Sequence, residues 1–229
     1  MGRALGAVLS AEAREKNCQT RCLPAGKMNM NEPIHDRRFG NERPSNGGFP
    51  ARTERSRRGS LLSVIMEDWR CNRHYKSRFV LALFRLAHAS YNDRRHFTRA
   101  LTAPYRLLYR LIVDWVMGID IPCQVTMGRR VVLYHCVGIV INDRVTIGDG
   151  CTIRHGVTIG NKLGKDGESA PPIVGQRVEF GAGAIVIGDI SIGDDATVGA
   201  GAVVTRNVAQ CAIVVGNPAR EVARNAPRI

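Results

Sequence analysis

Residues 174–208 read VGQRVEFGAGAIVIGDISIGDDATVGAGAVVTRNV and repeat one pattern every six residues. Each unit begins with a hydrophobic residue, which glycine usually follows, and a small or branched apolar residue comes four places after the first. The leading positions are Val174, Phe180, Val186, Ile192, Val198 and Val204, and their partners are Val178, Ala184, Ile190, Ala196, Ala202 and Val208. This period indicates a solenoid, because one short unit cannot bury its apolar face alone and must stack on its neighbours.

The same period begins earlier in the chain. Ile141, Ile147, Ile153 and Ile159 lead four further units before an interruption at residues 161–172. We therefore predict a mainly β fold, a parallel β-helix over residues 119–210 that residues 161–172 leave as a loop. Residues 211–229 are expected to form a C-terminal tail.

The N-terminal part has a different composition. Residues 1–65 carry twelve Lys/Arg against six Asp/Glu and no sustained apolar period, which predicts a disordered basic tail. An alternative is that this segment is not part of the natural protein, since Met66 opens a stretch suited to a natural start. The apolar run near the N-terminus is short for a signal peptide, and no stretch is long enough to span a bilayer.

Residues 66–118 are expected to form an α-helical lead-in, with two helices between residues 78 and 117. The apolar faces that the sequence predicts consist of Phe79, Leu83, Leu86 and Ala87 in the first helix, and Leu107, Leu108, Leu111, Ile112 and Trp115 in the second. These helices either cap the open end of the β-helix, which is the preferred interpretation, or lie on a membrane surface as a peripheral contact.

Charge and cysteine content narrow the function classes. The net charge is +13, but the basic residues are not interleaved with aromatic residues and no nucleic-acid-binding module is visible. Attraction to anionic ligands such as coenzyme phosphates or lipid headgroups explains the charge, so no nucleic-acid partner is predicted. Seven cysteines without paired spacing favour a reducing compartment, and we expect a cytoplasmic protein, with association at the inner face of the membrane left open.

His135 is a candidate general base. It lies just before the repeat slips by two residues between Ile139 and Ile141, and an imidazole can take and return a proton at neutral pH. Asp120, fifteen residues earlier and nearly one coil of about eighteen residues away, is the natural group to orient it. A single histidine in a strand is also often structural, and that interpretation remains open at this point.

Four motifs connect these positions with a known family: Gly118–Ile121, Val137–Val140 after His135, Gly156–Gly160 and Val215–Arg220. Together they resemble the hexapeptide-repeat acyltransferases, in the branch similar to serine acetyltransferases. The stretches Val140–Asn142 and Thr152–Asn161 resemble more closely the colanic-acid-type acetyltransferases of exopolysaccharide biosynthesis.

The resemblance implies a left-handed parallel β-helix that assembles as a homotrimer, with acetyl-CoA bound between subunits as the co-substrate. By motif match, it implies that His135 is the catalytic histidine and that Asp120 is its acidic partner. Small residues at Gly160, Ala182 and Ala200 match positions along the pantetheine arm, and Arg220 matches the end of the coenzyme; tight corners also require small residues. The family's zinc enzymes need three histidines, and the sequence offers only His135 and His155 at the repeat, so no metal is predicted.

The acceptor is predicted from departures from the family pattern. In serine acetyltransferases an acidic residue precedes the catalytic histidine and an Arg-His pair ends the loop, where this chain has Tyr134 and Ser169-Ala170. Tyr134 suits stacking on a sugar face, and His155 is a second candidate for contacting the substrate. We therefore expect an O-acetyltransferase acting on a sugar hydroxyl in exopolysaccharide biosynthesis, on a nucleotide-linked or lipid-linked saccharide. The alternatives are serine O-acetylation and a non-catalytic trimeric scaffold.

Overall fold

The computed structural model describes residues 60–93, 95–164, 167–168 and 170–225. The basic tail predicted at residues 1–65 therefore lies outside the described residues, except for its last six positions. Helical structure begins earlier than expected, at Leu61 rather than Met66. The helical segments are α2 (Leu61–Cys71), α3 (Tyr75–Asn92), α4 (His96–Leu101), α5 (Ala103–Arg110) and the π-helical turn η1 (Leu111–Val116). In the described part of the chain, no helix is long and apolar enough to cross a membrane.

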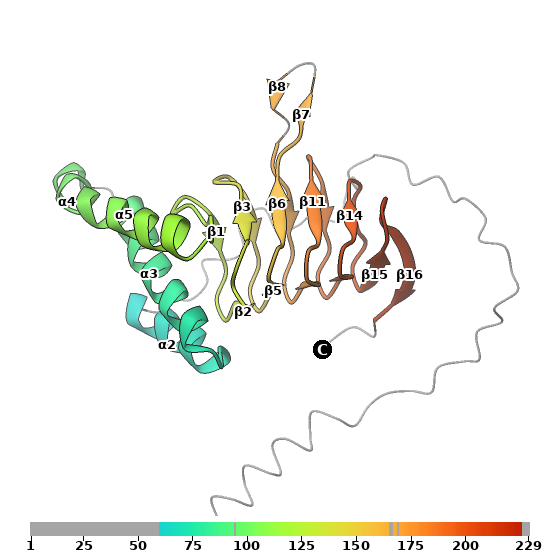
Figure 1. Ribbon diagram of the computed structural model, residues 1–229, viewed down its shortest axis with the longest axis horizontal. Coiled ribbons are helices and arrows are strands. Elements are labelled where there is room, and N and C mark those ends of the chain that lie inside the picture. The colour runs from blue at the N-terminus through green and yellow to red at the C-terminus, as the bar shows by residue number, and fades with distance from the viewer. Residues whose placement is uncertain (1–59, 94, 165–166, 169, 226–229) are drawn as a thin grey trace, which may run out of the picture. The chain divides into compact units, whose positions relative to one another are not determined.

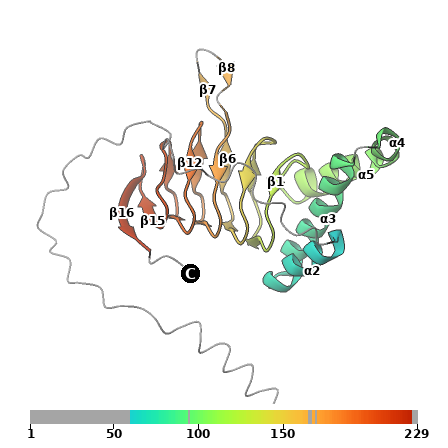
Figure 2. The ribbon, with the colours of Figure 1, turned by 180° about the vertical axis from the view of Figure 1, so that it is seen from behind.

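The strands that follow form a three-sided parallel β-helix (Figures 1 and 2). The first sheet contains β1 (Thr126–Met127), β4 (Thr146–Ile147), β9 (Ile173–Val174) and β12 (Ser191–Ile192). The second sheet contains β2 (Val132–Tyr134), β5 (Thr152–Arg154), β10 (Glu179–Phe180), β13 (Thr197–Val198), β15 (Ala212–Val215) and β16 (Arg220–Arg224). The third sheet contains β3 (Val140–Ile141), β6 (Thr158–Gly160), β11 (Ile185–Ile187) and β14 (Val203–Val204).

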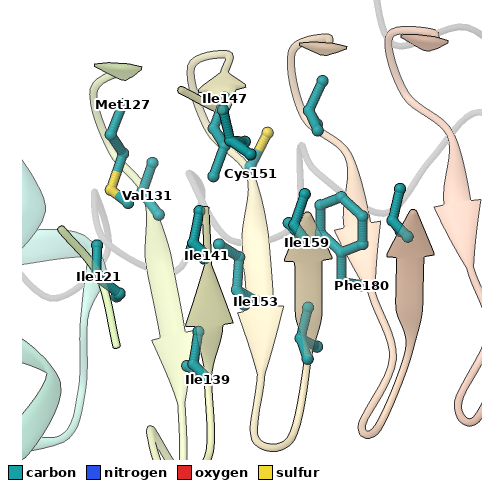
Figure 3. Close-up of a cluster of buried hydrophobic side chains, with 14 of the residues drawn as sticks. Ile121, Met127, Val131, Ile139, Ile141, Ile147, Cys151, Ile153, Ile159 and Phe180 are labelled. Atoms are coloured by element: carbon teal, nitrogen blue, oxygen red, sulfur yellow. The ribbon is translucent and has the colours of Figure 1, made fainter. Parts of the chain in front are cut away.

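Inward-facing side chains stack in register from coil to coil and form one core. Ile153 lies opposite Leu133 on one side and Phe180 on the other, and Ile159 lies opposite Ile141 and Val186. Figure 3 shows Ile141, Ile153, Ile159 and Phe180 pointing into the space that the three sheets enclose. All the leading and partner positions of the six-residue period are buried, so the period predicted from the sequence is the period of the core.

The interruption at residues 161–172 contains a short antiparallel hairpin, β7 (Leu163–Gly164) with β8 (Gly167–Glu168). Figure 1 shows that hairpin leaving the coil between β6 and the following strand. The stretch predicted as a C-terminal tail differs from expectation, because β15 adds a further parallel strand and β16 returns antiparallel beside it. This hairpin covers the last open edge of the second sheet, which would otherwise present unpaired backbone groups.

The helices close the other end of the β-helix with side chains. Asn72 donates to the carbonyl of Val131 and accepts from the amide of Leu133, so its side chain pairs with β2 as a strand would. The Ser77 hydroxyl donates to the Leu133 carbonyl, and the Tyr109 hydroxyl donates to the Ile121 carbonyl. The predicted cap is therefore present, and it satisfies backbone groups that a sheet end leaves unpaired.

Both predicted helix faces need correction. Of the face predicted for α3, Ala87 is buried and Leu83 packs against the core, but Phe79 and Leu86 are exposed, and Val80, Leu81 and Phe84 are buried instead. The reason is that Ser77 and Arg85 lie on the buried face and bind carbonyls of the first coil.

In α5 and η1 the residues that pack inward are Tyr105, Tyr109 and Val113, so most of the predicted face is exposed. Here the hydroxyl groups of Tyr105 and Tyr109 decide the orientation, because each donates to a backbone carbonyl.

Candidate active site

His135 lies in a corner that is longer than the equivalent corner of the next coil. Tyr134 pairs with Arg154, and Val140 pairs with Thr158. The chain therefore advances six residues between these positions in the first coil, but only four in the second. The two extra residues force a local change of backbone direction, and His135 adopts φ 52°, in the left-handed region that non-glycine residues seldom occupy. Its side chain is exposed as a result.

Two other imidazole rings lie beside His135. The His155 ring, one coil further on, lies 6.0 Å from it in an edge-on arrangement, and the His74 ring lies 5.3 Å from it. In the described part of the chain, none of the three histidines forms an ion pair with a carboxylate. Nor do the described residues include a group of three His, Cys, Asp or Glu arranged to hold a metal ion.

His74 was missed by the sequence analysis. It is the residue before α3, and it reaches His135 only because Asn72 and Ser77 fix the start of that helix to β2. A partial signal was available, since a polar Asn and Ser flank this histidine on a segment expected to cap the coil. Nothing in the sequence gives the register of the helix against the coil, so the contact itself could not be predicted.

Asp120 lies in the coil segment before His135, where it bridges to Val140 in the third sheet. No hydrogen bond joins Asp120 to His135 in the described part of the structure, so the predicted pair is brought to neighbouring segments but not into contact. Burial and the nearby Asp114 carboxylate raise the pKa of Asp120, and the Arg110 guanidinium acts against that rise. These three side chains line one shallow cleft between η1 and the first coil.

Tyr134 is half-buried on the second sheet, and the Arg154 guanidinium lies 5.7 Å from the centre of its ring. One face of the ring predicted to stack on a sugar is therefore already beside a cation. Arg154 comes from the same coil as His155, which places a positive charge next to the histidine cluster.

The small residues predicted to contact the coenzyme divide into two groups. Ala182 and Ala200 occupy the same corner in successive coils as His155, because the amide of Gly183 donates to His155 and that of Gly201 donates to Ala182. Gly160 lies at another corner, at the end of β6, where its carbonyl accepts from Gly188. Arg220 begins β16, is exposed, and donates to the adjacent Ala219 carbonyl.

Among the described cysteines, Cys71 at the end of α2 is exposed, and partial burial and the Asp68 carboxylate raise the pKa of its thiol. Cys136 is buried beside the Ser77 hydroxyl, and Cys151 is a core residue whose thiol pKa is raised by burial to about 12. An exposed imidazole on a strained corner, with a column of small residues leading away from it, suits proton transfer at the end of an extended ligand. The site geometry therefore fits a general base better than covalent catalysis.

Comparison with known proteins identifies the family of this chain. The family model for the bacterial transferase hexapeptide, described as six repeats, matches residues 171–206. The chain is 41% identical over 159 residues to an Escherichia coli protein named as colanic acid biosynthesis acetyltransferase WcaB, covering 68% of this chain and 97% of that protein. It is 36% identical to the serine acetyltransferase of Helicobacter pylori over 173 residues, covering 72% of this chain and 96% of that protein.

Solved structures give the same result for the fold. The soybean serine acetyltransferase apoenzyme is 32% identical with a TM-score of 0.57, covering 71% of this chain and 69% of that chain. The Neisseria gonorrhoeae serine acetyltransferase is 28% identical with a TM-score of 0.62, covering 73% and 67%. These similarities confirm the left-handed parallel β-helix predicted from the sequence. The chain belongs to the bacterial hexapeptide-repeat transferases and is an acetyltransferase of that family.

Proposed function

We propose that this protein transfers the acetyl group of acetyl-CoA to a sugar hydroxyl during exopolysaccharide biosynthesis. The observation that carries the proposal is the environment of His135: the rings of His74 and His155 lie beside it, the Arg154 guanidinium lies over the neighbouring Tyr134 ring, and no ion pair joins it to a carboxylate among the described residues. A zwitterionic amino acid needs an acidic group for its ammonium, and a saccharide does not. The 41% identity to a protein named for colanic acid biosynthesis, over 97% of its length, supports the same acceptor class.

In the proposed reaction His135 acts as general base. An imidazole nitrogen takes the proton of the acceptor hydroxyl while the hydroxyl oxygen attacks the thioester carbonyl carbon. A carbon–oxygen bond forms, the carbon–sulfur bond breaks, and the imidazolium returns its proton to the leaving thiolate. Asp120 is proposed to orient the imidazole as an ionised carboxylate, which accepts from an imidazole N–H and does not itself take the proton.

Substrate positions follow from the column of corners. We propose that the coenzyme arm lies along Ala182 and Ala200, with Gly160 and Arg220 contacting other parts of the coenzyme, and that Tyr134, His155 and His74 contact the acceptor. Assembly as a homotrimer is part of the proposal, and exposed aliphatic side chains on the outer faces of the sheets, such as Val140 and Ile173, support it. We propose a cytoplasmic location from the cysteine content; the five described cysteines are free thiols.

Serine is the second candidate acceptor, because solved structures similar to this chain include several serine acetyltransferases. The two acceptors are separated by measuring free CoA released from acetyl-CoA with L-serine, nucleotide sugars and lipid-linked oligosaccharides. His135→Ala should reduce turnover by about 10²–10⁴-fold while acetyl-CoA binding and assembly are retained. His96→Ala, an exposed histidine on α4, is the matched control and should remain active.

Turnover with saccharides alone supports the proposal. Turnover with L-serine that depends on His135 would show that serine is the acceptor, and the proposed mechanism would still hold. Acetyl transfer that survives in His135→Ala would contradict the mechanism itself, whichever acceptor is used.

A further inference from the structure

The helix formed by α5 and η1 is apolar on two opposite faces. One face packs inward through Tyr105, Tyr109 and Val113. The other, which we call the outer stripe, consists of Leu107, Leu108, Leu111 and Trp115, and the exposed fraction of these side chains is 61%, 51%, 44% and 82%. Such a continuous exposed stripe is unusual on a soluble surface and marks an interaction site.

The residues around the outer stripe are strongly basic. Between residues 95 and 116 the sequence contains four arginines and one acidic residue, Asp114. Arg110 is exposed and directly precedes Leu111, so it flanks the stripe. Arg106 is held by the Thr102 hydroxyl and the Arg99 carbonyl, which fixes a second positive charge on the same helix.

Charge complementarity indicates which partner binds the outer stripe. A second copy that met this surface stripe to stripe would bring Arg110 against its own equivalent, and residues 1–65 of the chain carry twelve basic against six acidic residues, so both would bring like charge to this surface. An anionic lipid surface offers the opposite charge for the arginines and an acyl boundary for the leucines and tryptophan. We propose that the outer stripe docks on an anionic membrane surface.

Docking in this way has a consequence for the site. The same helix supplies Arg110 and Asp114 to the cleft that contains Asp120. The headgroup layer would therefore lie close to the candidate site, which suits an acceptor presented from the membrane. The membrane contact itself does not depend on which acceptor is used.

Fluorescence of Trp115 tests the proposal directly, because the chain has only two tryptophans. In a Trp69→Phe background of the full chain, vesicles of phosphatidylcholine with phosphatidylglycerol should shift the Trp115 emission to the blue. Vesicles of phosphatidylcholine alone should not, and added salt should reverse the shift. Leu107→Ser should weaken co-sedimentation by about fivefold or more, and adding Leu111→Ser should weaken it further.

Leu62→Ser on α2 is the matched control, since Leu62 is 67% exposed and should be dispensable for vesicle binding. CoA release with a water-soluble acceptor should be unchanged in Leu107→Ser, which separates membrane docking from the proposed reaction. Failure to bind anionic vesicles, or equal binding to neutral vesicles, would overturn the proposal. So would a change of oligomeric state in Leu107→Ser with unchanged vesicle binding, because the stripe would then be an interface between copies.

Discussion

The two ends of the β-helix are closed by different means. At the C-terminal end the backbone does most of the work: β16 pairs antiparallel with β15, and the amide of Asn225 donates to the Cys211 carbonyl. At the N-terminal end side chains from the helices bind backbone groups of the first coil, among them Asn72, Ser77, Arg85 and Tyr109.

This difference shows which kind of closure can fix a specific arrangement of side chains in a repetitive fold. A backbone closure needs only a continuing strand and is tolerant of sequence. A side-chain closure fixes one register between distant segments, and at this end it also brings His74 to within 5.3 Å of His135, measured between ring centres. The closure and the candidate site therefore depend on the same docking of α3.

The largest expected difference in stability between the two ends comes from a buried ion pair in the helical cap. Asp68 and Arg85 form an ion pair of 2.8 Å in the helical cap, and both side chains are almost completely buried. Burial raises the pKa of Asp68, while Arg85 acts against that rise, so each charge depends on the other. Asp68→Asn should lower the free energy of unfolding by about 3–5 kcal/mol, since the buried Arg85 keeps its charge without a carboxylate to balance it.

A matched pair nearer the other end is the control. Arg177 binds Asp195 through two hydrogen bonds of 2.7 Å, but the Arg177 side chain is 36% exposed. Asp195→Asn should cost only about 1.5–3 kcal/mol, because water can solvate the released guanidinium. Denaturant unfolding of both variants measures the difference, and equal losses would show that the cap is not held by its buried charges.

The dependence of the site on the cap is tested at His74. His74→Asn keeps a residue suited to precede a helix and removes the imidazole. We expect kcat/KM for the acceptor to fall about tenfold, with the KM for acetyl-CoA and the unfolding midpoint unchanged. His96→Asn, at the start of α4, is the equivalent change away from the site. Unchanged acceptor kinetics would mean that His74 only lies near the site.

The smallest effect on stability is expected from a change of pH. His88 donates from Nδ1 to the Cys123 carbonyl, and its Nε2 accepts from the side-chain amide of Asn92. Burial lowers the pKa of His88, opposed by the Cys123 carbonyl and assisted by Arg85. The unfolded chain then binds the proton first, so stability should fall as pH drops below the ordinary histidine value of 6.5.

Thermal melts between about pH 7.5 and about pH 5.5 measure this slope. In His88→Gln, which retains a donor for the Cys123 carbonyl, the slope should be smaller than in the parent protein. A parent whose melting temperature is constant over that range would show that His88 does not link stability to pH.

Sequence alone was sufficient for the coil, because the core repeats every six residues and each inward position is apolar. It also located His135, since the slip between Ile139 and Ile141 corresponds to the two extra residues of the corner. Whether His135, Asp120, Tyr134, His155 and the coenzyme positions act as proposed stays a prediction.

The helical cap was harder to predict. The helix of α5 and η1 is apolar on both faces, so hydrophobic periodicity could not choose between Tyr109 and Leu111 as the buried residue. The choice depends on a hydrogen bond from Tyr109 to Ile121 that only the folded chain provides. His74 was missed for a similar reason, because its contact with His135 spans two segments that no repeat relates.

The lengthened corner at His135 also limits what the protein would gain from duplication of its coils. The later corners, led by Gly156, Gly183 and Gly201 in the left-handed conformation, are close copies of one another. In the proposed mechanism, duplication of one of those coils would lengthen the wall along which the coenzyme arm is proposed to lie, but it would add no second base. The proposed reaction centre would therefore stay single in each chain while the length of the wall changed.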